Sequence, residues 1–96
     1  MKDEGKIKHL RRHIDRIDTV IITALAERMS LMPEIADYKK KNNIAVFDEE
    51  REVEIMKTLK SIAKEQGLEE GFVEEVFLSI LNESKRIQND IINEPE

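Results

Sequence analysis

Several polar side chains fall where the periodicity of this chain predicts the apolar face of a helix. Arg28 stands in place of an isoleucine in a row of isoleucines spaced seven residues apart, and Lys39 follows eleven residues later on nearly the same face. Ser84 and Gln88 interrupt another apolar stripe near the C-terminus. Polar groups in a helical core are costly unless they meet partners. Their recurrence predicts a small polar pocket that binds an anionic ligand.

Arg28, Lys39 and Arg11 each have a structural alternative to ligand binding. Arg28 could fix the register of a helical core through an ion pair with Glu52, and Lys39 could lie along the surface at a helix end. Arg11 is seventeen residues before Arg28, which is about 25 Å along a helix and on another face. The two arginines therefore cannot hold one small ligand within one chain. Arg11 is a solvated arginine unless an antiparallel second copy brings it to its partner's site.

Asp48, Arg51, Glu52, Ser84 and Gln88 complete the candidate set. Asp48 suits a helix N-cap, and Arg51 and Glu52 suit the exposed first turn that follows it. Ser84 and Gln88 are one helical turn apart on one face. A serine can satisfy its hydroxyl on the carbonyl one turn earlier, whereas an inward-facing glutamine has no such local partner. Gln88 is therefore the stronger candidate of the two for a site residue.

His9 and His13 have the four-residue spacing of a two-histidine metal site. No third ligand accompanies them, and both lie off the main apolar seam. The chain also lacks cysteine, a glycine-rich phosphate loop and a Ser-His-Asp order. We therefore expect neither a metal nor a cofactor.

The chain predicts an all-α fold of three helices, because proline and glycine are scarce and no alternating β-branched pattern occurs. The expected helices span residues 6–41, 49–66 and 70–92. Asn42 and Asn43 suit the end of the first helix, Asp48 the start of the second and Gly67 its end. The residues expected to be buried are Val53, Met56, Leu59, Ile62 and Ala63 in the second helix and Val73, Phe77, Ile80, Ser84, Ile87 and Ile91 in the third.

The first expected helix is long for a chain of this size. About 35 helical residues extend about 52 Å, whereas a compact domain of this length has a radius of gyration near 13 Å. Its heptad seam, which consists of Ile7, Leu10, Ile14, Ile17, Ile21, Ala24, Leu31, Ile35 and Tyr38, therefore needs a partner. The simplest partner is a second copy, so we expect a homodimer. Pro33 predicts a kink near Met29 to Pro33, because the seam continues in phase beyond it.

Composition narrows the class of protein. The 96 residues suit a single domain spanning 1–96. A net charge of −5 argues against nucleic acid as a partner. No apolar run reaches the ~20 residues of a membrane span, and the first residues lack the apolar stretch of a signal peptide. We expect a soluble, cytoplasmic protein.

The motifs, taken in order, resemble the all-helical chorismate mutases of the bacterial and archaeal type. The matching residues are Leu10-Arg11, Ile14, Asp18, Glu27-Arg28, Lys39, Val46, Asp48, Arg51-Glu52, Glu83-Ser84 and Gln88. Each short motif is weak alone, but the ordered set with its gaps spans nearly the whole chain. The resemblance implies an intertwined helical dimer with two equivalent active sites. It also implies conversion of chorismate to prephenate in phenylalanine and tyrosine biosynthesis, a Claisen rearrangement without cofactor.

The resemblance implies roles for the cations and the amide. Arg28 and the partner chain's Arg11 would hold the two substrate carboxylates. Lys39 and Gln88 would donate hydrogen bonds to the ether oxygen as its C–O bond breaks. An amide donates at any pH, so activity should not fall steeply between mildly acidic and neutral pH.

The remaining roles concern the rest of the substrate. By the same resemblance, Glu52 would accept a hydrogen bond from the ring hydroxyl, with Asp48 close by, and Arg51 and Ser84 would line the site. Pro33 departs from the family pattern and places the convergence of Arg28 and Lys39 in question. Two alternatives stay open. One is an isochorismate pyruvate lyase of similar fold, and the other is a non-catalytic helical module for regulation or dimerisation.

Overall fold

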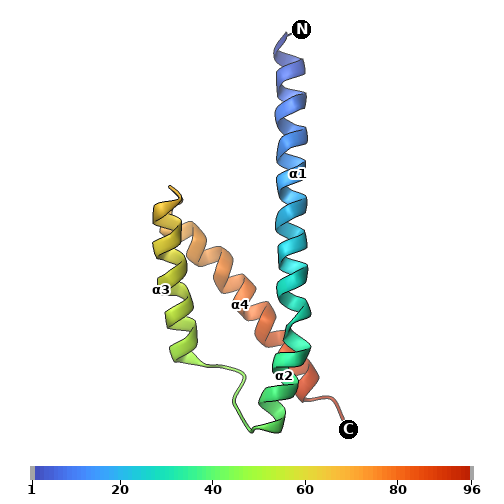
Figure 1. Ribbon diagram of the computed structural model, residues 1–96, viewed down its shortest axis with the longest axis vertical. Helices are drawn as coiled ribbons and strands as arrows, with labels where there is room; N and C mark the ends of the chain where they lie inside the picture. The colour runs from blue at the N-terminus through green and yellow to red at the C-terminus, as the bar shows by residue number, and fades with distance from the viewer. Residues whose placement is uncertain (1, 96) are drawn as a thin grey trace. The chain divides into compact units, whose positions relative to one another are not determined.

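The computed structural model describes residues 2–95, with side chains from residue 4 onward. Four helices follow one another over that range: α1 (Lys2–Ser30), α2 (Met32–Lys41), α3 (Glu49–Glu65) and α4 (Glu70–Ile92) (Figure 1). Residues 2–95 contain no strand. The predicted all-α fold class is confirmed.

The segment predicted as one kinked helix over 6–41 is two helices divided at Leu31. The Leu31 N–H bonds the Arg28 carbonyl at 3.3 Å, so α1 ends in a tightened turn. Pro33 is the second residue of α2, where a missing N–H breaks no intrahelical bond. The disturbance lies where Pro33 predicted it. It takes the form of a one-residue break at Leu31, since ending α1 before the proline avoids the lost bond and the steric clash.

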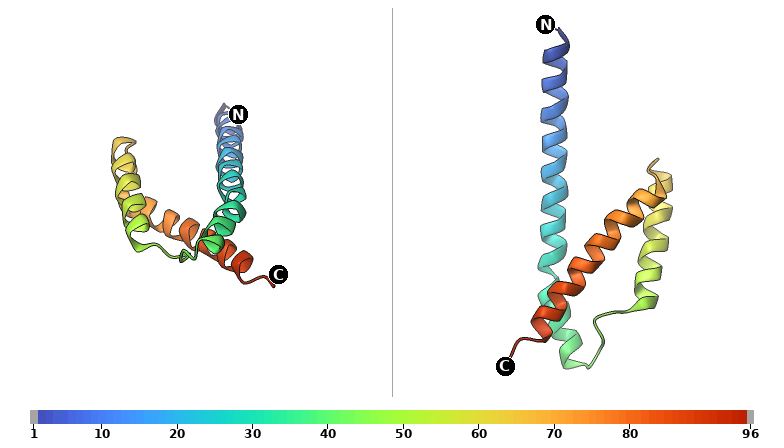
Figure 2. Two further views of the ribbon diagram at one scale, coloured as in Figure 1. Left: turned by 60° about the horizontal axis from the view of Figure 1, so that its bottom comes forward. Right: turned by 180° about the vertical axis from the view of Figure 1, so that it is seen from behind.

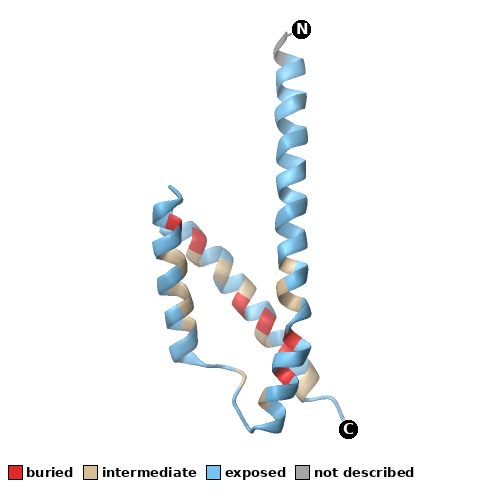
Figure 3. Ribbon diagram, in the orientation of Figure 1, coloured by how far each residue is buried: buried red, intermediate tan, exposed pale blue. Residues whose placement is uncertain are grey.

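The chain forms two compact units, residues 1–31 and 32–96. The first contains α1, which is about 44 Å long at 1.5 Å per residue. Its described side chains are exposed apart from Leu25, Arg28 and Met29, which are half-buried (Figure 3). The apolar seam Ile7, Leu10, Ile14, Ile17 and Ile21 is 43% to 52% exposed. Residues 4–30 thus present a regular apolar row without a core of their own.

The second unit has a small core built by α4 against α2 and α3. The N-terminal part of α4 lies beside α3 and its C-terminal part beside α2 (Figures 1 and 2). The buried apolar residues are Met32, Ala36, Ala63, Val73 and Leu81, which come from all three helices. Ala36 and Ala63 are 0% and 2% exposed, because their small side chains let the helix backbones approach closely.

The predicted buried stripes are partly correct. Ala63, Val73 and Ser84 are buried, and most of the others are half-buried. Val53 and Ile62 are 63% and 45% exposed, which contradicts their expected burial. Within the second unit α3 has α4 as its main neighbour, so the flanks of its apolar stripe stay uncovered.

The helices end and begin at the capping residues that the sequence predicted. Asn43 has a φ of 54°, and the Ile44 N–H bonds the Lys39 carbonyl at 2.9 Å, closing α2 with a Schellman-type turn. Gly67, with a φ of 75°, ends α3 by the same bond pattern. Asp48 caps α3. Among the residues described, no helix combines the length and the apolar character needed to cross a membrane.

Candidate functional site

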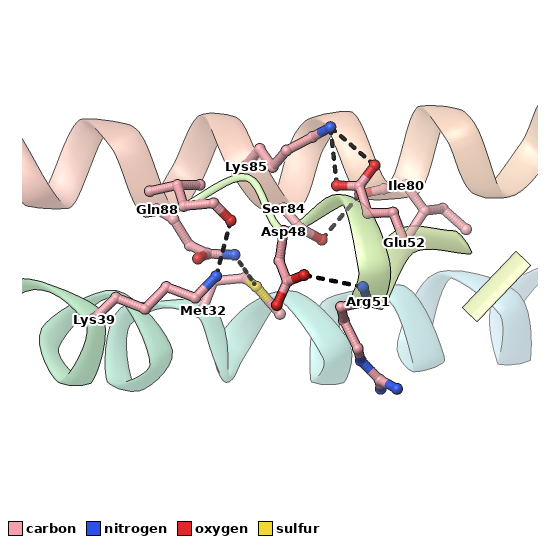
Figure 4. A network of polar contacts seen from close by, with 10 residues as sticks. Met32, Lys39, Asp48, Arg51, Glu52, Ile80, Ser84, Lys85 and Gln88 are labelled. Carbon is pink, nitrogen blue, oxygen red and sulfur yellow. Dashed lines mark hydrogen bonds and ion pairs between the residues drawn. The ribbon is translucent and has the colours of Figure 1, made fainter. Parts of the chain in front are cut away.

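Lys39 lies in the last turn of α2 and points inward rather than into solvent. Its ammonium donates a hydrogen bond to the Val46 carbonyl at 2.9 Å, and its side chain is half-buried (Figure 4). Val46 belongs to the loop between α2 and α3, which returns toward the helix it has just left. The structure thus anchors the half-buried Lys39 through a backbone oxygen.

Gln88 is buried between α4 and α2 and is poorly satisfied. It is 6% exposed, and its Nε2 donates to the Met32 sulfur at 3.4 Å. Its Oε1 has no hydrogen-bond partner among the described atoms. A thioether is a weak acceptor, and buried polar groups without good partners are rare in proteins and mark sites under functional constraint. The amide therefore has hydrogen-bonding capacity that the fold does not use.

Ser84 lies one turn before Gln88 on α4. It is 4% exposed, and its Oγ donates to the Ile80 carbonyl at 2.9 Å. This is the structural alternative that the sequence left open, since the helix backbone satisfies the hydroxyl donor. The short side chain keeps this part of the α4 face small next to Gln88.

Asp48 and Arg51 stand at the start of α3. The Asp48 carboxylate accepts the Arg51 N–H at 3.0 Å, as an N-cap does. The Arg51 guanidinium forms an ion pair with Glu54, and in Figure 4 its side chain extends away from the cluster around Gln88. Both residues have the structural roles that their sequence positions allowed, and an exposed ion pair of this kind is weak.

Glu52 is not a surface charge, because Lys85 reaches it from α4. The Lys85 ammonium lies 3.2 Å from Oε1 and 3.0 Å from Oε2 of Glu52. It also lies 4.7 Å from the centre of the Phe47 ring, a cation–π contact. Sequence reasoning missed Lys85. The available signal was a lysine immediately after Ser84, between two positions already singled out.

Arg11 and Arg28 belong to α1 and thus to the other compact unit. Arg28 is half-buried. Arg11 is exposed and lines an open hollow of about 250 Å³ together with Lys8, Arg12 and Asp15. The candidate residues therefore divide into six on α2 to α4 and two on α1.

An exposed cluster borders the buried α4 face. Arg86 bonds Glu83 at 2.6 and 2.8 Å and Asp90 at 2.9 Å. The hydrogen bond from Arg86 lowers the pKa of Glu83, and the same contact raises that of Arg86. Both side chains face solvent, so this cluster is separate from Ser84 despite its adjacency in sequence.

Apart from Asp48 and Arg51, the candidate residues of the second unit offer two donors, one compensated carboxylate and a small hydroxyl. Lys39 and Gln88 can donate to an oxygen that gains negative charge, and Glu52 can accept from a hydroxyl. Among the side chains that the structure describes, no group of three or more His, Cys, Asp or Glu is placed to hold a metal ion. This chemistry suits binding and electrostatic stabilisation of a polar, anionic molecule.

Comparison with known proteins identifies the class. Residues 10–89 match the family described as chorismate mutase type II. The chain is similar to a chorismate mutase of Methanocaldococcus jannaschii, with 30% identity over 91 residues that cover 95% of this chain and 92% of the relative. No solved structure matches it. The helical fold and the sequence together place the protein among isomerases of the chorismate mutase class. The chain belongs to the chorismate mutase type II family.

Two further relatives show how the family is used. The bifunctional chorismate mutase/prephenate dehydratase of Buchnera aphidicola subsp. Schizaphis graminum is 31% identical over 93 residues, which are 97% of this chain but 24% of that protein. The 4-amino-4-deoxychorismate mutase of Streptomyces venezuelae is 22% identical over 93 residues, covering 97% of this chain and 90% of that protein. The predicted family and its setting in aromatic amino-acid biosynthesis are confirmed.

Proposed function

We propose that this chain converts chorismate to prephenate by an intramolecular Claisen rearrangement, as a cytoplasmic enzyme formed by the single domain 1–96. The observation that carries the proposal is the buried Gln88 amide, whose Nε2 donates to the weakly accepting Met32 sulfur at 3.4 Å and whose Oε1 has no partner among the described atoms. Lys39 lies in the same cluster on α2 (Figure 4). Similarity to the chorismate mutase of M. jannaschii over nearly the full length of both chains supports the choice of reaction.

The reaction needs conformational restriction and stabilisation of charge on one oxygen. The ether C–O bond breaks while a C–C bond forms within the same molecule, so no nucleophile or proton transfer is required. Negative charge develops on the ether oxygen in the transition state. Lys39 would exchange the Val46 carbonyl for that oxygen, and Gln88 would exchange the Met32 sulfur. Both donors then reach a more negative acceptor than the one they leave. This exchange stabilises the transition state relative to the free enzyme and substrate.

The two carboxylates of chorismate require cations from two chains in this proposal. Arg28 would hold one of them, and the partner subunit's Arg11 the other, since the two arginines of one helix are about 25 Å apart along it. The exposed seam of α1 supports a homodimer, because an amphipathic helix gains most of its stability by burying such a face. Each site would therefore need both protomers.

The remaining candidates would hold the substrate ring in place. Glu52 would accept from the ring hydroxyl, with Asp48 near it at the start of α3. Arg51 would turn from Glu54 toward the substrate, which costs little because that ion pair is exposed. The buried Ser84 would line the site beside Gln88.

The test is the loss of chorismate absorbance in the ultraviolet, with the product identified as prephenate. Lys39→Ala and Gln88→Ala should each lower kcat/KM by about a hundredfold or more, the usual effect of removing a donor to a developing oxyanion. Lys41→Ala is the matched control, because this exposed lysine on the same helix pairs with Asp37. Its activity should equal that of the parent protein.

A folded protein that leaves chorismate unchanged would overturn the proposal. Pyruvate release from isochorismate would then identify the lyase alternative. Inactivity with both substrates would identify a non-catalytic helical module.

A further inference from the structure

The carboxylate of Glu52 is held by a cation outside the proposed set of substrate-binding residues. Lys85 places its ammonium 3.0 and 3.2 Å from the two oxygens, and both side chains are 22% to 23% exposed. An ion pair this far from bulk solvent is screened less than a surface pair. The pair therefore acts as one nearly neutral unit rather than as a free carboxylate.

One contact and its place on α4 define the position of Lys85. The Phe47 ring lies under the ammonium at 4.7 Å, and the α4 backbone places Lys85 one residue after Ser84 and three before Gln88. Figure 4 shows Lys85 reaching from α4 to Glu52 at the edge of the cluster that contains Ser84 and Gln88. Lys85 thus adjoins the proposed site and directs one of its residues.

The surroundings of Glu52 are otherwise acidic. Glu49, Glu52 and Glu74 line a hollow of about 240 Å³ between α3 and α4, with Phe47, Val53, Met56, Leu78 and Leu81 as the apolar wall. Glu74 is paired with Lys60 at 3.1 Å. Without Lys85, the Glu52 carboxylate would present a negative charge to whatever binds beside it.

The name of one relative indicates which ring substituent of the substrate the negative charge of Glu52 would favour. The Streptomyces venezuelae protein named 4-amino-4-deoxychorismate mutase is similar to this chain over 97% of its length. The compound in that name carries an amino group where chorismate carries the ring hydroxyl. An alkyl amine is cationic near neutral pH, so it is attracted by a carboxylate and repelled by an ammonium, whereas a hydroxyl is neutral.

We propose that Lys85 is a positioning residue that sets the specificity for the ring substituent. It orients the Glu52 carboxylate to accept from a hydroxyl, and its own charge disfavours an ammonium at the same place. The inference rests on the proposed function, because it takes Glu52 to face the ring substituent. Either substrate rearranges by breaking its own C–O bond and forming a C–C bond, so no co-reactant enters.

The test compares two substrates in three variants. For the parent protein, Lys85→Met and Lys85→Arg, kcat/KM is measured with chorismate and with 4-amino-4-deoxychorismate. Lys85→Met keeps the length of the side chain and removes the charge, so the ratio of amino to hydroxyl substrate should rise about tenfold, mainly through KM. Lys85→Arg retains the charge and should keep the parent ratio. Lys85→Gln repeats the test should Lys85→Met fail to fold.

The matched control is Lys60→Met combined with Glu74→Gln, since this double change removes the other α3–α4 ion pair without leaving an uncompensated charge in the hollow. It should leave the ratio unchanged, which separates a local charge effect from a loosened pairing of the two helices. A folded Lys85→Met or Lys85→Gln protein that turns over chorismate with the parent ratio would overturn the inference alone. A parent protein that rearranges neither substrate would overturn the proposed function and the inference with it.

Discussion

The two compact units of this chain use polar and apolar residues in opposite ways. In α1 the apolar row is 43% to 52% exposed between Ile7 and Ile21. In the unit formed by α2, α3 and α4, apolar residues such as Ala36 and Leu81 are buried, and so are the polar Ser84 and Gln88. The first unit thus exposes an apolar row, whereas the second buries two polar residues, of which Gln88 has an Oε1 without a hydrogen-bond partner among the described atoms.

The second unit also shows how its polar residues are held before a substrate arrives. Lys39 bonds a backbone carbonyl, Gln88 a thioether, and Glu52 a lysine on another helix. These partners differ in strength, since an ion pair binds a carboxylate more firmly than a sulfur binds an amide. In the proposed site, a ligand would therefore displace the weak partner of Gln88 at the lowest cost, and Glu52 would meet it with its direction already set by Lys85.

The largest expected effect comes from placing a charge in the α1 seam. Ile14→Asp should abolish dimer formation, because an unpaired carboxylate at a buried interface costs ~3 kcal/mol or more per protomer. Activity should fall to background, since each proposed site needs the partner's Arg11. Light scattering reports the molar mass, and the chorismate assay reports the activity.

Thr23→Asp is the control for this change, because Thr23 is an exposed residue of α1 outside the seam. It should remain dimeric and active. A dimer with full activity in Ile14→Asp would show that the seam of α1 is not the interface.

The sharing of a site between protomers gives the next effect. Arg11→Ala and Gln88→Ala should each lose about a hundredfold in kcat/KM. When the two inactive proteins are mixed in equal amounts and allowed to exchange subunits, mixed dimers carry one intact site. Activity should recover to about a quarter of the parent value. Mixtures that stay inactive although mass spectrometry detects mixed dimers would place both residues in the site of one chain.

Gln88 predicts a smaller effect that depends on pH. The amide donates at any pH, so the parent kcat should be nearly level between mildly acidic and neutral conditions. In Gln88→Glu the carboxyl donates only when protonated, and burial raises its pKa. Its kcat should be highest at acidic pH and fall as pH rises through that pKa. A parallel decline in the parent protein, with circular dichroism unchanged, would contradict the role of Gln88 as a donor.

Local signals in the sequence predicted most of the fold. Helix periodicity and helix-capping residues depend only on neighbouring positions in the sequence. The structure contains the predicted helix ends at Asn43 and Gly67 and the predicted N-cap at Asp48. Pro33 predicted a disturbance, but not that α1 would end at Ser30 and α2 begin at Met32. Whether a proline bends or divides a helix depends on how the turn before it is satisfied, which the residue types alone do not specify.

The candidate site was less predictable because its contacts join distant residues. Lys85 and Glu52 are 33 residues apart, and Gln88 and Met32 are 56 apart. The pattern of polar residues on apolar helix faces indicated Gln88 and Ser84. It missed Lys85, because a lysine beside a serine is usually solvated. It also left Arg51 with two possible roles, of which the ion pair with Glu54 is the one in this structure.

The smallest expected effect concerns Glu83, which adjoins Ser84 in sequence but faces solvent. Glu83→Gln removes its ion pair with Arg86 and should leave kcat/KM unchanged, in contrast to variants of the buried α4 face.

Arg86 lowers the pKa of Glu83 in the folded protein. The pair therefore stabilises the fold above the pKa that Glu83 has in the unfolded chain, and this contribution is lost as pH falls through the folded value. The melting temperature of the parent protein should exceed that of Glu83→Gln by no more than about a degree at neutral pH. The difference should vanish in acid. A loss of activity in this variant would mean that the exposed face of α4 takes part in the site.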